Sequence, residues 1–473
     1  MSQSQNNETK VLVLSLLITG AVLGGGAWWF LQGQGESGEG GTSTTTTTVT
    51  PTQGNTDATQ RLSSGDRILL SDLSSPAKQA GVSAIAAGNY TEAVTQLEQA
   101  LQQNRNDPEA LIYLNNARIG NNPAHTIAVS APINTSANVA KEILRGVAQA
   151  QNEVNAAGGI NNMPLKVVIA SDDDDPQVAQ QIAAQLGQNG DVLGVVGHFS
   201  SSTSLAAAEV YQEQGLTMIS PTSTAVELSS KGNYIYRTVP SDRFAGSALA
   251  AYQLEGLNLQ KAAVFFNSGS DYSKSLKNVF TTDIFSKGGE VVAEYDFNAA
   301  NFNASQVVEE AINQGAEALM LVPSANLDLA LQVIQVNEGR LPILAGDNAY
   351  NPQILELGGR NAVGMVVAIP WHILANPGAA FPQAASQLWG GEVSWRTAMA
   401  YDAAVALIGA IAVDPSRTGV QEALTASDFQ AQGAANNISF LPSGDRNQAA
   451  QLVEVQPGNR TQFNYEFVPV NNQ

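Results

Sequence analysis

Two clusters of hydroxyl side chains are the residues of this sequence best placed to do chemistry. One is 200-SSSTS-204, which follows the apolar run 192-VLGVVG-197. The other follows 216-LTMIS-220 and comprises Ser220, Thr222, Ser223 and Thr224. We expect each cluster where a buried strand passes into a helix, whose first turn presents unpaired N–H groups and the positive end of the helix dipole. Hydroxyls added to such a terminus make an uncharged pocket that suits a carboxylate.

Other uses of these hydroxyls fit the sequence less well. A single Ser or Thr often only caps a helix, but five in a row exceed what capping requires. A phosphate site would be accompanied by GxxxxGK[ST], or by GxGxxG with an acidic residue, and neither pattern is present. A serine hydrolase needs a base, and the chain has only His125, His198 and His372, with no GxSxG motif. We therefore predict a binding protein and not an enzyme, with His198 as a structural residue.

The elements that must position the hydroxyls alternate along the chain from about His125. Apolar strand candidates are 126–131, 165–170, 192–197, 216–220, 262–266, 318–322 and 363–369. Amphipathic helices such as 177–188 and 305–315 fall between them. This alternation, over roughly 350 residues, predicts an α/β fold with doubly wound parallel sheets in two lobes. Ligands of such sheets bind beyond the carboxyl ends of the strands, where both clusters lie.

Composition excludes several classes of protein. Among 473 residues, 22 Lys and Arg stand against 42 Asp and Glu, so the net charge is −20. A nucleic-acid partner is not expected, since binding phosphates requires positive charge. The absence of cysteine excludes thiolate metal sites and disulfides. We expect no cofactor and no metal; the acidic run 172-DDDDP-176 lacks the alternating ligands of a calcium loop and is expected to be a solvated turn.

The N-terminal region predicts attachment to a membrane. Residues 11–31 carry no charge and are long enough to span a bilayer, so we expect a transmembrane anchor after a cytoplasmic tail of residues 1–10. A cleaved signal peptide is the alternative, but the apolar run is longer than is usual for one. Lys10 places the amino terminus inside, and the rest of the chain is then extracytoplasmic. Residues 32–64, rich in Gly, Ser and Thr, are expected to be a flexible linker.

A helical segment is predicted at 76–121, with breaks at Gly88-Asn89 and Asp107-Pro108. Its pattern resembles one tetratricopeptide repeat followed by the first helix of another: Gly81, Gly88, Tyr90, Ala93, Leu97 and Ala100. A plain helical hairpin acting as a spacer fits equally well. One repeat cannot bury its own apolar face. The segment must therefore pack on a neighbouring domain or on a protein partner.

Further motifs resemble the leucine/isoleucine/valine-binding type of periplasmic binding protein, from about His125 to the end. The matching segments are VVGHFSSST, MISPTST, 236-YRTVPSD-242, 271-DYSKS-275, 345-AGDNAYN-351, 400-AYDAAVALIGAI-411 and 440-FLPSGDR-446. The resemblance implies the type I periplasmic binding fold, two α/β lobes joined by three crossovers. Lobe 1 would comprise about 125–241 and 372–439, and lobe 2 about 242–371 and 440–473. It also implies an amino acid or small amide as ligand, held between the lobes.

The resemblance carries the ligand-binding roles onto six residues: Ser201, Ser202, Thr222, Thr224, Tyr272 and Asp347. Ser201 and Thr224 would donate to the ligand's α-carboxylate, with Ser202 in the same cluster. The Thr222 carbonyl and the Asp347 carboxylate would receive the ammonium, and Tyr272 would close over the ligand. Without the resemblance, Tyr272 is equally a surface aromatic, and Asp347 a turn former before Asn348.

The sequence also departs from the family. Ser136 and Ser324 or Ala325 stand near places where branched-chain binders carry aromatic residues, so the side-chain pocket is expected to be more polar or roomier. Trp371 either lines the cleft or packs in the core. The family implies delivery of ligand to an ABC-type importer, with a permease in the membrane as partner. A membrane-tethered amino-acid sensor or scaffold is the alternative.

Overall fold

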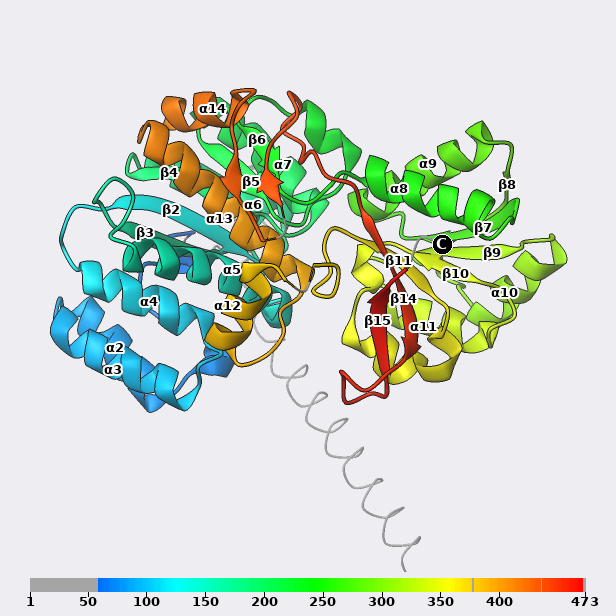
Figure 1. Ribbon diagram of the computed structural model, residues 1–473, viewed down its shortest axis with the longest axis horizontal. Coiled ribbons are helices and arrows are strands. Elements are labelled where there is room, and N and C mark those ends of the chain that lie inside the picture. Colours follow the sequence, from blue (N-terminus) through cyan, green and yellow to red (C-terminus); the bar gives the residue numbers. More distant parts are fainter. Residues whose placement is uncertain (1–57, 377, 435, 471–473) are drawn as a thin grey trace, which may run out of the picture. The chain divides into compact units, whose positions relative to one another are not determined.

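Two sheets organise the part of the chain that the computed structural model describes, residues 58–376, 378–434 and 436–470 (Figure 1). The tail and anchor expected at 1–10 and 11–31 lie outside these residues, as does most of the expected linker. The two sheets correspond to the two lobes expected from the sequence, and we refer to them as lobe 1 and lobe 2.

Lobe 1 is built on a six-stranded sheet in the order β1-β3-β2-β4-β5-β6. Its strands are β1 (Leu62–Ser63), β2 (His125–Ala131), β3 (Leu165–Ser171), β4 (Val192–Val196), β5 (Thr217–Ser220) and β6 (Ile235–Arg237). All neighbours are parallel except β1 and β3. Every residue of β4 and β5 is buried, as expected for strands covered on both faces.

Helices cover both faces of the lobe 1 sheet (Figure 1). On one face pack α6 (Pro176–Gln188) and α7 (Ser201–Gln214), in a cluster with Ala128, Val195 and Met218. On the other lie α5 (Ala137–Ala156) and α13 (Trp395–Val413), together with Ile127, Val129 and Val196. The lobe also contains α12 (Ala380–Trp389), α14 (Arg417–Thr425) and the short pair β12 (Ala431–Gln432) and β13 (Asn437–Ile438).

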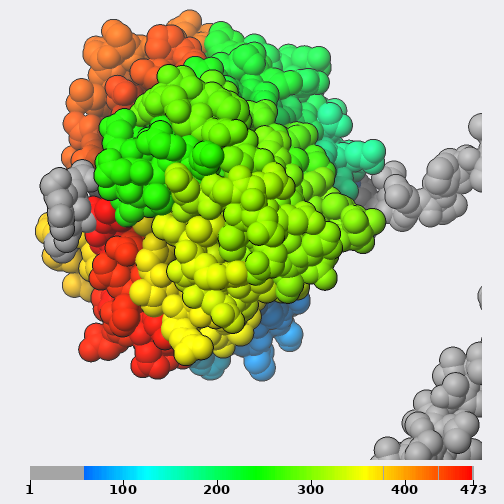
Figure 2. All heavy atoms as spheres, turned by 90° about the vertical axis from the view of Figure 1, so that its right-hand side faces the viewer, coloured from blue at the N-terminus to red at the C-terminus, as the bar shows by residue number. Residues whose placement is uncertain are grey.

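Lobe 2 is built on a seven-stranded sheet in the order β15-β14-β11-β10-β9-β7-β8. Its strands are β7 (Lys261–Phe266), β8 (Glu290–Asp296), β9 (Ala318–Val322), β10 (Ile343–Ala345), β11 (Val366–Ile369), β14 (Gln451–Pro457) and β15 (Tyr465–Pro469). The last two are antiparallel, so the sheet is mixed. Figure 2 shows this lobe from outside, with the C-terminal strands (red) beside residues near 350 (yellow).

Alternate residues of β7 separate the two cores of lobe 2. Ala262 and Val264 pack with α8 (Asp242–Ala251) and α9 (Asp271–Ser286). Ala263 and Phe265 belong to the cluster that includes α10 (Ala304–Asn313) and α11 (Leu327–Asn337). Successive side chains of a strand point to opposite faces, which explains the division.

The chain passes between the lobes three times: from β6 to α8, from β11 to α12, and from β13 to β14. Buried ion pairs anchor the third crossover to lobe 1. The Arg237 Nε donates to the Asp445 Oδ1 at 2.7 Å, and Arg446 pairs with Asp402 at 3.1 Å. Trp371, on the second crossover, is 2% exposed and contacts Phe381 edge-on. It therefore packs in the core and does not line the cleft.

Three helices form the segment expected at 76–121: α2 (Pro76–Ala86), α3 (Tyr90–Gln103) and α4 (Pro108–Ile119). The breaks at Gly88-Asn89 and Asp107-Pro108 are confirmed. Helix α4 is buried on nearly all sides because it contacts α3 on one side and α5 and β3 of lobe 1 on the other (Figure 1). The Asn116 side chain donates to the Val167 carbonyl at 2.7 Å and accepts from the Val167 N–H at 3.1 Å. Both backbone groups of Val167 in β3 are thereby hydrogen-bonded. The neighbouring domain thus covers the apolar face of this segment.

The folded part begins earlier than the expected linker boundary at residue 64. A turn of 3-10 helix (Ala58–Arg61) leads into β1, which pairs with Ile169 and Ala170 of β3. Arg61 also forms an ion pair with Asp173. Residues 58–64 therefore belong to lobe 1, because they complete the edge of its sheet.

Among the described residues, α13 is the one helix with the length and composition of a membrane span. It is instead a core helix of lobe 1, packed directly on α5. At the crossing, a Cβ on Gly146 would lie 2.3 Å from the Thr397 carbonyl oxygen and 2.4 Å from the Tyr401 nitrogen. Only glycine allows these two backbones to approach so closely.

We therefore expect Gly146→Ala to destabilise the protein by about 1–3 kcal/mol or more, because the added methyl group overpacks a backbone contact. Gly391→Ala is the matched control, since nothing lies within 4 Å of a Cβ at that exposed glycine. Urea unfolding followed by tryptophan fluorescence measures both variants. Equal midpoints would show that the α5–α13 crossing tolerates a side chain.

Candidate functional site

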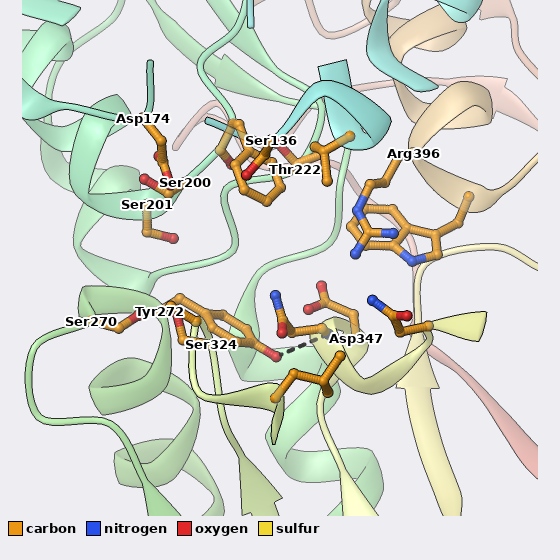
Figure 3. A pocket seen from close by; sticks show the side chains of 17 residues that line it. Ser136, Asp174, Ser200, Ser201, Thr222, Ser270, Tyr272, Ser324, Asp347 and Arg396 are labelled. Atoms are coloured by element: carbon orange, nitrogen blue, oxygen red, sulfur yellow. Dashed lines mark hydrogen bonds between the residues drawn. The ribbon is translucent and has the colours of Figure 1, made fainter. Parts of the chain in front are cut away.

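A cavity of about 250 Å³ lies between the two lobes at the carboxyl ends of their strands (Figure 3). Lobe 1 lines it with Ser136, Val139, Asp174, Phe199, Ser200, Ser201, Thr222, Trp395 and Arg396. Lobe 2 lines it with Ser270, Tyr272, Ser324, Ala325, Leu327, Asp347, Asn348 and Asn351. The cavity is therefore where a small molecule would contact both halves of the protein.

Most of the hydroxyls hold the two turns of lobe 1 together. The carbonyl oxygen of His198 accepts from the Ser220 hydroxyl at 2.9 Å, and that of Phe199 accepts from the Thr222 hydroxyl at 2.7 Å. Ser200 caps α7 by accepting from the Thr203 N–H. The Ser201 hydroxyl accepts from the Ala225 N–H at 3.2 Å. These bonds keep two neighbouring strand ends in one rigid surface that lines the cavity.

Beneath this surface His198 is a structural residue, as expected. It is fully buried, with Nδ1 2.7 Å from the Asp172 Oδ2 and Nε2 3.1 Å from the Tyr211 hydroxyl. The acidic run is not the solvated turn that we expected. Asp172 is buried and Asp175 caps α6, while Asp174 lines the cavity, where burial raises the pKa of its carboxyl. Each carboxylate has its own partners, and the described residues contain no cluster able to hold a metal ion.

Four of the six predicted site residues line the cavity: Ser201, Thr222, Tyr272 and Asp347. Ser202 and Thr224 do not. The Ser202 hydroxyl donates instead to the Asp271 Oδ2 at 2.8 Å, a contact between the lobes. Thr224 is 3% exposed, and its backbone carbonyl accepts from the Asp242 N–H at 2.8 Å. The ligand-binding roles expected for Ser202 and Thr224 therefore stay predictions.

The lobe 2 wall is formed by Tyr272 and Asp347. The Asn348 N–H donates to the Tyr272 hydroxyl at 3.5 Å, which places the ring against the turn that carries Asp347 (Figure 3). A Cβ on Gly346 would lie 2.2 Å from that hydroxyl oxygen, so the glycine makes room for the ring. Burial raises the pKa of Asp347 to about 6, and Arg396 opposes this increase. A cationic partner in the cavity would therefore stabilise the charged form of this carboxylate.

Sequence reasoning missed Trp395 and Arg396 at the start of α13. The Arg396 guanidinium lies over the Trp395 ring at 4.5 Å, and its Nη1 is 3.3 Å from the Glu142 Oε2. One signal was available in 394-SWR-396. The positive end of the helix dipole disfavours a cation in the first turn, so an arginine there calls for a specific partner.

The chain matches the model of the family described as "Periplasmic binding protein" over residues 125–460, and it belongs to this family. An amino acid binding protein of Pseudomonas aeruginosa is 33% identical over 183 residues, 37% of this chain and 48% of that protein. A Leu/Ile/Val-binding protein of Escherichia coli is 32% identical over 170 residues, 36% of this chain and 45% of that protein. The chain thus spans about half the length of these curated relatives.

Solved structures share the fold. A leucine-binding protein of Thermotoga maritima matches with a TM-score of 0.64 and 24% identity, covering 73% of this chain and 99% of that chain. A branched-chain amino acid transporter substrate-binding protein of Streptococcus pneumoniae, in complex with isoleucine, matches with a TM-score of 0.62 and 21% identity, covering 73% and 100%. The type I periplasmic binding fold expected from the sequence is confirmed.

The contact between Ser202 and Asp271 leads to a prediction. Removing the hydroxyl with Ser202→Ala loses a hydrogen bond to a charged group at a partly exposed position, so we expect ligand affinity to fall roughly three- to tenfold, or about 1 kcal/mol. The pocket itself is unchanged, because Ser202 does not line it. Ser230→Ala, which removes an exposed hydroxyl from lobe 1, is the control. Calorimetric titration compares the two, and equal affinities would show that this contact does not help to hold the lobes together.

Proposed function

We propose that the protein captures an amino acid or a small amide between its two lobes. One observation carries the proposal: a single cavity brings Ser201 and Thr222 of lobe 1 opposite Asp347 and Tyr272 of lobe 2. A zwitterion removed from water needs hydrogen bonds at both ends, because an unpaired buried charge is very costly. Lobe 1 offers hydroxyls and the amino end of α7 to the carboxylate, and Asp347 offers a negative charge to the ammonium.

The relatives support this proposal. The proteins of P. aeruginosa and E. coli are described as binding amino acids. Two transporter substrate-binding proteins with the same fold were solved in complex with leucine or isoleucine. We therefore propose delivery of the captured ligand to an ABC-type permease. The extracytoplasmic location and the anchor at residues 11–31 are part of the same proposal, since a tethered binding protein stays beside its permease. Closure of the lobes about the three crossovers would bury the ligand.

A thermal-shift screen of the purified protein tests the proposal. The panel contains the common amino acids, small amides, urea and sugars. A true ligand at about 100 times its dissociation constant should add about 2.7 kcal/mol of stability and raise the melting temperature. A shift caused by sugars and by no amino compound would contradict the proposed chemistry of the cavity.

A further inference from the structure

Arg396 is a buried cation at one end of the cavity. The residue is 7% exposed, and its side chain projects from the first turn of α13, with Trp395 beside it. Figure 3 shows Arg396 on the opposite side of the cavity from Asp174, Ser200 and Ser201. The two ends of the lobe 1 wall therefore differ: hydroxyls at one end and a guanidinium at the other.

The donors at the guanidinium end are not fully used. Arg396 has one ion pair, from Nη1 to Glu142 at 3.3 Å, and its Nε is buried without a hydrogen-bond partner among the described residues. The indole Nε1 of Trp395 is likewise buried and without a partner there. Buried donors left unsatisfied are costly, and those of a charged group cost more. Two buried donors at the α13 end of the cavity thus lack an acceptor among the described residues.

The proposed pose of an amino acid directs its side chain toward this end. With the α-carboxylate at Ser201 and the amino end of α7, and the ammonium at the Thr222 carbonyl and Asp347, the Arg396 end of the cavity remains for the side chain (Figure 3). A branched aliphatic side chain would cover the guanidinium without offering an acceptor. A side chain that ends in an oxygen would satisfy it with charge-assisted hydrogen bonds.

We propose that Arg396 makes the site selective for amino acids whose side chain ends in a carboxylate or a carboxamide. This inference rests on the proposed function. The guanidinium already lies near two acidic groups, Glu142 and Asp347, which partly balance its charge. The site should therefore bind a side chain that ends in a neutral carboxamide as well as one that ends in a carboxylate. Ser136, Ser324 and Ala325 add small residues to the cavity wall and leave room for the longer polar chains.

Calorimetric titration of the purified protein with glutamate, aspartate, glutamine, asparagine, leucine, isoleucine and valine tests this selectivity. At least one acid or amide should bind tenfold or more tightly than any branched-chain amino acid. Tightest binding of a branched-chain amino acid would overturn the inference and leave the proposed function standing. Failure of every amino acid and amide to bind would contradict the proposed function itself.

A matched pair of variants tests the role of Arg396. Arg396→Met keeps much of the length of the side chain and removes its donors, so it should abolish the preference and bring leucine to within threefold of the best polar ligand. Arg340→Met removes an exposed arginine that pairs with Glu309 in lobe 2 and should leave all affinities unchanged. A preference that survives in a folded Arg396→Met protein would overturn the assignment.

A third variant keeps the test informative if Arg396→Met does not fold. Glu142→Gln removes the partner of the guanidinium without touching Arg396. The ratio of the affinity for an acidic amino acid to that for its amide should then rise at least threefold. The reason is that less negative charge near Arg396 repels the carboxylate of the ligand's side chain. An unchanged ratio of acid to amide would show that Arg396 does not face the ligand's side chain.

Discussion

Replacing Asp347 with asparagine is expected to weaken amino-acid binding roughly ten- to hundredfold. A hydrogen bond to a charged group contributes about 1.5–3 kcal/mol, and each 1.4 kcal/mol changes the dissociation constant tenfold. Asparagine keeps the shape of the side chain and removes the charge that would face the ammonium. The fold should remain intact, because the charged form of this carboxyl is not favoured by its buried position.

Isothermal titration measures the loss, and Asp328→Asn is the matched control. Asp328 is an exposed residue in the first turn of α11, in the same lobe but outside the cavity lining. The control should bind like the parent protein. Equal affinity in the parent and in Asp347→Asn would remove Asp347 from the site.

The same carboxyl makes binding depend on pH. Its pKa is about 6 without ligand, and pairing with an ammonium lowers that pKa, so ligand binding favours the deprotonated form. Between pH 8 and pH 5 the affinity should therefore fall by about tenfold. Burial also raises the pKa of nearby Asp242 to about 7, so this group titrates in the same range. The part of the pH dependence that Asp347→Asn removes belongs to Asp347, and an undiminished dependence in this variant would assign it elsewhere.

The alternating pattern of the sequence predicted the strands that are buried on both faces. All seven expected strands are present, with β11 shorter than expected at Val366–Ile369. Most of the strands that were missed are short or lie at edges, and the longer inner strand β14 has only two buried residues. The edge strand β8 has no fully buried residue, and β6 and β10 contain three residues each. Their apolar signal is too short or too mixed to be distinguished from a loop.

The candidate site was predictable only in part, because its walls come from distant segments. The hydroxyl clusters are visible as local runs, and four of the six chosen residues line the cavity. Which hydroxyl in a run faces the cavity depends on the rotation of the first helical turn, so Ser201 and Ser202 could not be distinguished in advance. Arg396 follows Ser201 by almost two hundred residues, and only the packing of α13 on α5 brings it to the same cavity.

The helical segment 76–119 contains a buried cation whose removal should strongly destabilise it. Lys78 of α2 is fully buried and contacts Asp107 at 2.8 Å and Glu109 at 2.7 Å. Glu109 also accepts from the Leu69 N–H at 2.6 Å, which ties the chain before α2 to α4. This cluster joins three parts of the segment that packs on lobe 1, so its integrity determines whether the segment stays folded.

We expect Lys78→Met to cost about 3–5 kcal/mol, because removing one partner leaves two carboxylates buried without their counter-ion. Hydrogen exchange should show faster exchange of amides in α2, α3 and α4, and ligand affinity should be unchanged, since none of these residues lines the cavity. Burial raises the pKa of Asp107, and the positive charge of Lys78 lowers it again in part. In Lys78→Met this lowering is lost, so the pKa of Asp107 should rise further. A carboxyl with a raised pKa in the folded state binds its proton more tightly there than in the unfolded state. The stability lost in Lys78→Met should therefore be largest at pH 8 and shrink toward pH 4.

The triple variant Lys78→Met, Asp107→Asn, Glu109→Gln separates the charge from the packing. It removes the uncompensated carboxylates and keeps most of the volume, so it should recover much of the stability lost in Lys78→Met at pH 8. Asparagine still caps α4, where the Asp107 Oδ1 accepts from the Ala110 N–H at 2.9 Å. If Lys78→Met and the triple variant are equally unstable at every pH, the loss comes from packing. If neither is destabilised, the segment is held to lobe 1 by the α4 interface alone.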